Sequence, residues 1–127
     1  MRLVPDGAVH SWLQRQNSLD VFTTSVTEAE IILGVAILTD GKRKRDLEVA
    51  AQSIFGLFAD RILPFDSSAA RAFAVIVAGR RRVGQPIGDF DAQIAAITRS
   101  RGMSLATRNT KDFAQTGVAV INPWQGV

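Results

Sequence analysis

Three acidic residues occupy the same kind of position, three residues beyond the start of a predicted helix. The three motifs are Thr27-x-x-Glu30, Gly88-x-x-Asp91 and Asn109-x-x-Asp112. The first and the last directly follow predicted strands, and sites in open α/β sheets form where strands end and the next helices begin. Carboxylates that converge there repel one another unless a divalent cation neutralises them. The spacing therefore predicts a Mg²⁺-type site that handles phosphate groups.

Each acid also has a simpler explanation. A carboxylate in the first turn of a helix complements the helix dipole and stabilises it by about 0.3–1 kcal/mol. Asp91 stands apart because its predicted helix, from 86 to 102, carries isoleucine and alanine on most faces and is expected to be buried. A buried carboxylate needs hydrogen bonds, a cation or a metal ion. A helix-dipole role and a metal-binding role both stay open for Asp91 at this point.

Composition restricts the kind of metal. The chain has no cysteine and one histidine, His10. Thiolate zinc sites, iron–sulfur clusters and multi-histidine sites are therefore excluded, and a metal here has oxygen ligands, as Mg²⁺ or Mn²⁺ does. His10 lies on a predicted N-terminal helix, so a Ser/His/Asp triad is not expected. The net charge of +3 suits a polyanionic partner.

The order of predicted elements indicates the fold class. The 127 residues, 46% of them hydrophobic, are expected to form one compact domain over 1–127. With no long apolar run and no leader pattern, we expect a cytoplasmic protein without membrane contact. Strands are predicted at 21–26, 61–65, 103–107 and 118–121; helices are predicted at 5–16, 27–38, 43–59, 67–83 and 86–102, with a helical turn at 109–113. This alternation is typical of a parallel sheet covered by helices on both faces.

Several segments, in this order, resemble the PIN-domain ribonucleases, specifically the VapC-type and FitB-type toxins. They are SVTEAEIILG at 25–34, RILPFD at 61–66, PIGDFDAQIAAI at 86–97, ATRN at 106–109 with the Asp112-Phe113 pair, and INPW at 121–124. The resemblance covers essentially the whole chain. It implies an α/β PIN-like three-layer sandwich and a Mg²⁺- or Mn²⁺-dependent endoribonuclease. It also implies a homodimer that cleaves RNA and is inhibited by a cognate antitoxin encoded beside it.

The resemblance assigns roles to individual residues. Glu30 matches the glutamate of the family, and Asp91 matches its central metal-binding aspartate. The fourth polar position of the family follows Thr-Arg; here it is Asn109, with Asp112 one turn on, and which of the two serves the site stays open. The expected catalytic residues are thus Glu30, Asp91, Asn109 and Asp112, with Glu30, Asp91 and Asp112 as metal ligands. Arg108 adjoins this group and is expected to contact an RNA phosphate.

One departure from the family concerns the first strand. Family members begin with a strand that ends in Asp-Thr-Asn, lies mid-sheet and supplies a principal metal ligand. This sequence opens with MRLVPD, which aligns just after that segment. Without a central strand, two strand edges are expected to be unpaired. We expect the true start to lie upstream; a truncated relative, or a partner chain that supplies the pairing, are the alternatives.

The missing acid leads to a second functional hypothesis. If the chain begins at Met1, feeble or no metal-dependent cleavage is expected. The chain would then be a catalytically silent module that binds nucleic acid or an antitoxin. A phosphoacceptor domain also gathers acids at strand ends, but the order of motifs here does not suit it. An in-frame Asp-Thr-Asn segment upstream would favour the enzyme.

Two basic runs are predicted chiefly as solvated surfaces. Lys42 to Arg45 opens a predicted helix, and Arg80 to Arg82 closes another, where positive charge also complements the helix dipole. Both runs remain candidates for steering RNA.

Overall fold

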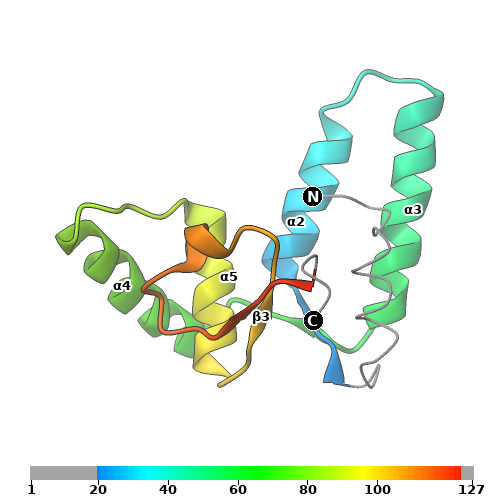
Figure 1. Ribbon diagram of the computed structural model, residues 1–127. Helices are drawn as coiled ribbons and strands as arrows, with labels where there is room; N and C mark the ends of the chain where they lie inside the picture. The colour runs from blue at the N-terminus through cyan, green and yellow to red at the C-terminus, as the bar shows by residue number, and fades with distance from the viewer. Residues whose placement is uncertain (1–19, 124–127) are drawn as a thin grey trace.

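The computed structural model describes residues 20–123 (Figure 1). Its helices are α2 (Ser25–Ala36), α3 (Lys42–Phe58), α4 (Ser67–Arg82), α5 (Asp89–Ser100) and the short 3-10 helix η2 (Thr110–Phe113). Its strands are β1 (Thr23–Thr24), β2 (Ile62–Leu63), β3 (Leu105–Ala106) and β4 (Val120–Ile121). The helix predicted at 5–16, with His10, lies outside the described residues. In the described part of the chain, every helix is too short or too polar to cross a bilayer.

The strands form two separate parallel pairs. β1 pairs with β2 in the register Thr23↔Ile62, and β3 pairs with β4 in the register Leu105↔Val120. The parallel direction agrees with the prediction, but the single continuous sheet does not form within residues 20–123, where β1 and β3 each have one strand neighbour. A strand lying between β1 and β3 would join the two pairs, and none of the described residues supplies it.

The start of α2 differs from the prediction. Thr24 has extended backbone angles, φ −120° and ψ 154°, and its side-chain oxygen accepts a hydrogen bond of 2.9 Å from the backbone N–H of Thr27. Thr24 is therefore the N-cap. The motif Thr27-x-x-Glu30 has the form of a capping box in the sequence, but the helix does not begin at Thr27. The capping hydrogen bond outweighs the strand preference of the β-branched residues at 23–26, so the predicted strand is cut to two residues. Glu30 consequently lies in the second turn of the helix.

The helix that carries Asp91 is the most deeply buried one. Five consecutive residues of α5, from Ile94 to Thr98, are buried, as is Ala92. α4 packs along α5 (Figure 1), and Ala69 and Ile76 of α4 belong to the same core cluster. The predicted burial of this helix is confirmed. Its start moves from 86 to Asp89, after the N-cap Gly88.

The helices α2 and α3 form a hairpin beside this core (Figure 1). They bury a second, smaller apolar cluster of Ile31, Ala51 and Phe55. The N-terminal end of α2 joins the main core, because Val26 packs in the cluster that contains Ile94 and Ala95. α2 therefore fixes the hairpin against the start of α5.

Truncation of the core should show how much α5 depends on its packing. Ile97 is fully buried, so Ile97→Ala is expected to lower the free energy of unfolding by about 2–5 kcal/mol, through lost apolar contacts and a residual cavity. Val75 of α4 is 57% exposed, and Val75→Ala should change the value by less than about 0.5 kcal/mol. Urea unfolding followed by circular dichroism measures both. Equal losses in the two variants would contradict the assignment of Ile97 to the core.

Candidate functional site

Asp91 lies at the point where α5 enters the core. It is the third residue after the N-cap Gly88, and the first turn also contains Asp89. The side chain is partly exposed, whereas Ala92, the next residue, is fully buried. Burial of α5 thus carries the carboxyl of Asp91 to the edge of the apolar interior. This partial burial raises the pKa of Asp91 above its ordinary value of 3.8, and the negative charge of Asp112 raises it further.

Asp112 approaches Asp91 because the turn that bears it is anchored in the core. Phe113 is 4% exposed and packs in the cluster formed by α5. The backbone N–H of Asp112 donates to the carbonyl of Asn109 over 3.1 Å, which closes the 3-10 turn. Asn109 is exposed and precedes this turn as its N-cap; its own N–H donates to Thr107 Oγ1 over 3.1 Å. The negative charge of Asp112 acts on Asp91, and the choice between Asn109 and Asp112 for the fourth position stays a prediction.

Glu30 reaches the same region from α2. It lies four residues, about one helical turn, beyond Val26, so the two share one face of the helix. Val26 packs against α5 in the core, and Glu30 therefore lies on the face of α2 that is turned toward the start of α5. Burial raises the pKa of Glu30 above its ordinary value of 4.5, and the charge of Asp91 raises it further.

The three predicted acids form a chain of neighbours rather than a compact cluster. Asp91 is in the middle, and it interacts electrostatically with Glu30 on one side and Asp112 on the other. Within residues 20–123, no three acidic or histidine side chains lie close enough together to hold a metal ion. The short ion pairs of this part of the chain all involve other carboxylates: those of Asp40, Asp46, Asp60 and Asp66. Within residues 20–123, none of these short ion pairs involves Glu30, Asp91 or Asp112.

The donor chemistry of this acidic chain fits a hard divalent cation. Mg²⁺ in proteins is commonly held by one or two carboxylates and retains several waters, so a full cage of protein ligands is not required. Carboxylates whose pKa values are raised by burial and by one another are typical of such a site. Glu30 and Asp91 would hold the ion, with Asp112 close to the second of them.

The sequence profile of the PIN domain matches residues 5–119 of this chain, which is most of its 127 residues. The chain belongs to the PIN-domain family. The family resemblance read from the sequence motifs is confirmed. The α/β PIN fold is confirmed as well, because solved PIN-type structures superpose on almost the whole chain.

The relatives of this PIN domain are bacterial toxins and ribonucleases. Toxin FitB of Neisseria gonorrhoeae is 42% identical over 125 residues, which cover 98% of this chain and 90% of that protein. VapC ribonuclease Y4jK of Sinorhizobium fredii is 34% identical over 122 residues, which cover 95% of this chain and 87% of that protein. The structure of FitAB bound to an IR36 DNA fragment has a TM-score of 0.86 at 43% identity, covering 97% of this chain and 87% of that one. The crystal structure of FitAcB from Neisseria gonorrhoeae has a TM-score of 0.85 at 42% identity, with coverage of 97% and 89%.

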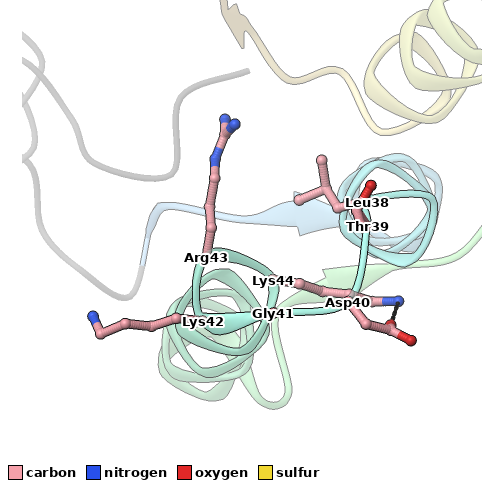
Figure 2. A pocket seen from close by; sticks show the side chains of 7 residues that line it. All are labelled: Leu38, Thr39, Asp40, Gly41, Lys42, Arg43 and Lys44. Atoms are coloured by element: carbon pink, nitrogen blue, oxygen red, sulfur yellow. Dashed lines mark hydrogen bonds and ion pairs between the residues drawn. The ribbon is translucent and has the colours of Figure 1, made fainter.

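The basic residues of this PIN domain differ in their surroundings. Arg108 is exposed in the loop after β3, next to Asn109, and its side chain makes no ion pair in the part of the chain that the structure describes. The run from Lys42 to Arg45 begins α3 at the tip of the α2–α3 hairpin, and Lys42, Arg43 and Lys44 line a pocket there (Figure 2). There Lys44 donates to the Asp40 carboxylate over 3.1 Å and to the carbonyl of Ala36 over 3.2 Å, while Lys42 pairs with Asp46. Arg108 is the basic residue that directly precedes Asn109, the N-cap of the turn that bears Asp112.

One residue of this PIN domain that the sequence interpretation assigned to the surface is buried. Arg80 is 6% exposed, whereas Arg81 and Arg82 are exposed. Arg80 lies four residues after Ile76 and eleven after Ala69, so it falls on the apolar face of α4 that packs on α5. The helical spacing of Arg80 from Ala69 and Ile76 indicates that Arg80 is buried. The run of three arginines was instead interpreted as an exposed charged surface.

The pKa values of Glu30 and Asp91 predict how pH changes the stability of this PIN domain without metal. The folded state binds these two protons more tightly than the unfolded chain does. Protonation of Glu30 and Asp91 therefore stabilises the folded state. Their contribution to the free energy of unfolding rises as the pH falls from neutral through the raised pKa values, and it decreases again as the pH rises. We expect the double variant Glu30→Gln/Asp91→Asn to gain stability relative to the parent chain at neutral pH, with a smaller gain at acidic pH. Thermal melting in EDTA at both pH values measures this difference; a gain that is the same at both would contradict the prediction.

Proposed function

We propose that this chain is a metal-dependent endoribonuclease, the toxin of a toxin–antitoxin pair, which hydrolyses phosphodiester bonds in RNA. The observation that carries the proposal is the chain of three neighbouring carboxylates, Glu30, Asp91 and Asp112, at the start of the buried helix of a PIN domain. Relatives named as a toxin and as a VapC ribonuclease match nearly the whole chain.

The acids supply the metal site in this proposal. Glu30 and Asp91 bind Mg²⁺ or Mn²⁺ through their carboxylate oxygens, and Asp112 completes the acidic surface on the other side of Asp91. Asn109 caps the turn that positions Asp112 and offers a further oxygen. A divalent ion held there polarises a water molecule and stabilises the charge that builds up on a backbone phosphate. PIN-domain nucleases generally use a divalent metal, and the ligand type here favours Mg²⁺ or Mn²⁺ over zinc.

Substrate binding is assigned to Arg108. Its exposed guanidinium follows β3 and lies next to the turn that bears Asp112. A guanidinium can donate two parallel hydrogen bonds to one phosphate. In this proposal Arg108 holds the RNA backbone so that a phosphate faces the carboxylates.

The partners in this proposal are a cognate antitoxin and a second copy of the chain. A solved member of the VapBC family of toxin–antitoxin systems, VapBC-5 from Mycobacterium tuberculosis, is similar to this chain, with a TM-score of 0.65 at 29% identity over 80% of the chain. α2 presents large apolar side chains to solvent: Ile32 is 54% exposed, Leu33 51% and Ile37 74%. Exposed apolar side chains gathered on one helix are typical of a protein interface.

The second candidate function is a catalytically silent PIN domain that binds nucleic acid or an antitoxin. Two observations favour it: no three acids form a metal-binding group within residues 20–123, and the strand pairs are not joined there. Incubation of the purified chain with fluorescently labelled single-stranded RNA, with Mn²⁺ or with EDTA, separates the two candidates. Cleavage with Mn²⁺ and none with EDTA supports the enzyme. RNA binding without cleavage in either buffer supports the silent module.

A further inference from the structure

The guanidinium of Arg80 connects the two segments that carry Asp91 and Asp112. Its Nη1 donates to the carbonyl of Asp112 over 3.0 Å and to the carbonyl of Ala114 over 2.8 Å. Its Nε donates to the carbonyl of Gln85 over 2.6 Å. One side chain on α4 is thus bonded to the turn that bears Asp112 and to the connector that leads into α5.

The connector between α4 and α5 both donates a hydrogen bond to Arg80 and accepts one from it. The backbone N–H of Gln85 donates to the carbonyl of Arg80 over 2.9 Å, in addition to the bond from the Arg80 side chain to the Gln85 carbonyl. Gln85 is followed by three residues that reach Gly88, the N-cap of α5, and Asp91 is three residues further. The position of Arg80 therefore restrains the start of α5 as well as η2.

The burial of Arg80 makes these bonds strong and costly to lose. The residue is 6% exposed, and a buried guanidinium must satisfy its N–H groups within the protein. Hydrogen bonds from a charged donor are roughly twice as strong as those between neutral groups. Three carbonyls from two loops would lose this donor if Arg80 were replaced by an apolar side chain.

We propose that Arg80 is a positioning residue, which holds the backbone of the Asp112 turn against the start of α5 and so sets the separation of the Asp91 and Asp112 carboxylates for binding a divalent cation. This inference rests on the proposed function of the acids as metal ligands. Arg80 acts through the backbone and does not touch substrate or metal.

The test compares Arg80→Met and Arg80→Lys with the same two changes at the exposed neighbour Arg82. Mn²⁺ binding is measured by electron paramagnetic resonance, at a temperature where circular dichroism shows each variant to be folded. We expect the dissociation constant of Arg80→Met to rise at least tenfold, that of Arg80→Lys to rise less, and both Arg82 variants to match the parent chain. Arg80→Lys keeps a charged donor, so it keeps the experiment decisive if Arg80→Met fails to fold.

A second measurement works without metal. Hydrogen exchange followed by nuclear magnetic resonance reports the amide of Asp112 in the turn and the amide of Ile97 in the core. In the Arg80 variants we expect exchange of the Asp112 amide to accelerate at least tenfold more than exchange of the Ile97 amide. Equal acceleration of both amides, or Mn²⁺ affinity unchanged in a folded Arg80 variant, would overturn the positioning role. Failure of the parent chain to bind Mn²⁺ would instead overturn the metal site, and the exchange rates alone would then decide whether Arg80 holds the turn.

Discussion

Asp91→Asn is expected to abolish Mg²⁺- or Mn²⁺-dependent RNA cleavage without lowering the melting temperature. Asp91 is the middle member of the acidic chain, since its charge acts on Glu30 and the charge of Asp112 acts on it. Asparagine at position 91 replaces the carboxylate by a neutral amide. The proposed metal site then loses the negative charge that acts together with Glu30 and Asp112. Metal-ion stabilisation of a phosphoryl transition state is worth several kcal/mol, so the rate of cleavage should fall at least about a hundredfold. Initial rates on a labelled RNA with Mn²⁺, together with thermal melting, measure both effects.

Asp89→Asn is the matched control for this experiment. Asp89 and Asp91 lie in the same first turn of α5, and both complement the helix dipole, but Asp89 is exposed. Removal of the charge at 89 should leave cleavage unchanged and alter stability by no more than about 1 kcal/mol. If Asp91→Asn instead lowered the melting temperature as Asp89→Asn does and left cleavage intact, Asp91 would be a helix-dipole residue and the nuclease site would lie elsewhere.

A chain extended at its N-terminus by a strand ending in Asp-Thr-Asn is expected to cleave RNA at least about a hundredfold faster than residues 1–127 alone and to melt at a higher temperature. In the described structure β1 pairs with β2 and β3 pairs with β4, and the two pairs are not joined. A strand between β1 and β3 would satisfy backbone groups along both unpaired edges. The resemblance to the PIN-domain toxins implies that the aspartate at the end of this strand is a metal ligand together with the residues that match Glu30 and Asp91.

The same extension ending in Asn-Thr-Asn separates these two effects. It offers the same backbone hydrogen bonds but lacks the carboxylate. We expect it to raise the melting temperature as much as the Asp-Thr-Asn extension does, with no gain in cleavage. An extension that changes neither the melting temperature nor the rate would show that β1 and β3 do not accept a strand between them.

Several local features of this PIN domain were predictable from the sequence. Asp66, which directly precedes the predicted helix at 67–83, is the N-cap of α4, and its carboxylate accepts a hydrogen bond from the N–H of Ala69 over 3.0 Å. Gly88 and Asn109 are the N-caps of α5 and η2, which places Asp91 and Asp112 three residues beyond these caps, as the motif spacing predicts. Capping and apolar periodicity involve residues within one or two turns of each other, so neighbouring residues in the sequence decide them.

The start of α2 shows where local prediction fails even over a short distance. The residues at 23–26 have high strand propensity, and a capping box at Thr27 competed with a cap at Thr24. The hydroxyl of Thr24 bonds both the N–H and the hydroxyl of Thr27, at 2.9 and 2.8 Å. Strand propensity is expressed only where a neighbouring strand pairs, and within the described residues β1 has one such neighbour.

The sequence by itself determined the family, the parallel direction of the strands, the burial of α5 and the acids at its start. Only the tertiary structure decided that Glu30 and Asp112 lie on either side of Asp91, that the strands divide into two pairs, and that Arg80 is buried while Arg81 and Arg82 are not. Helix starts and apolar faces depend on neighbours along the chain, whereas the meeting of α2, α5 and η2 depends on contacts between segments that are tens of residues apart. The relative positions of the three carboxylates depend on those distant contacts.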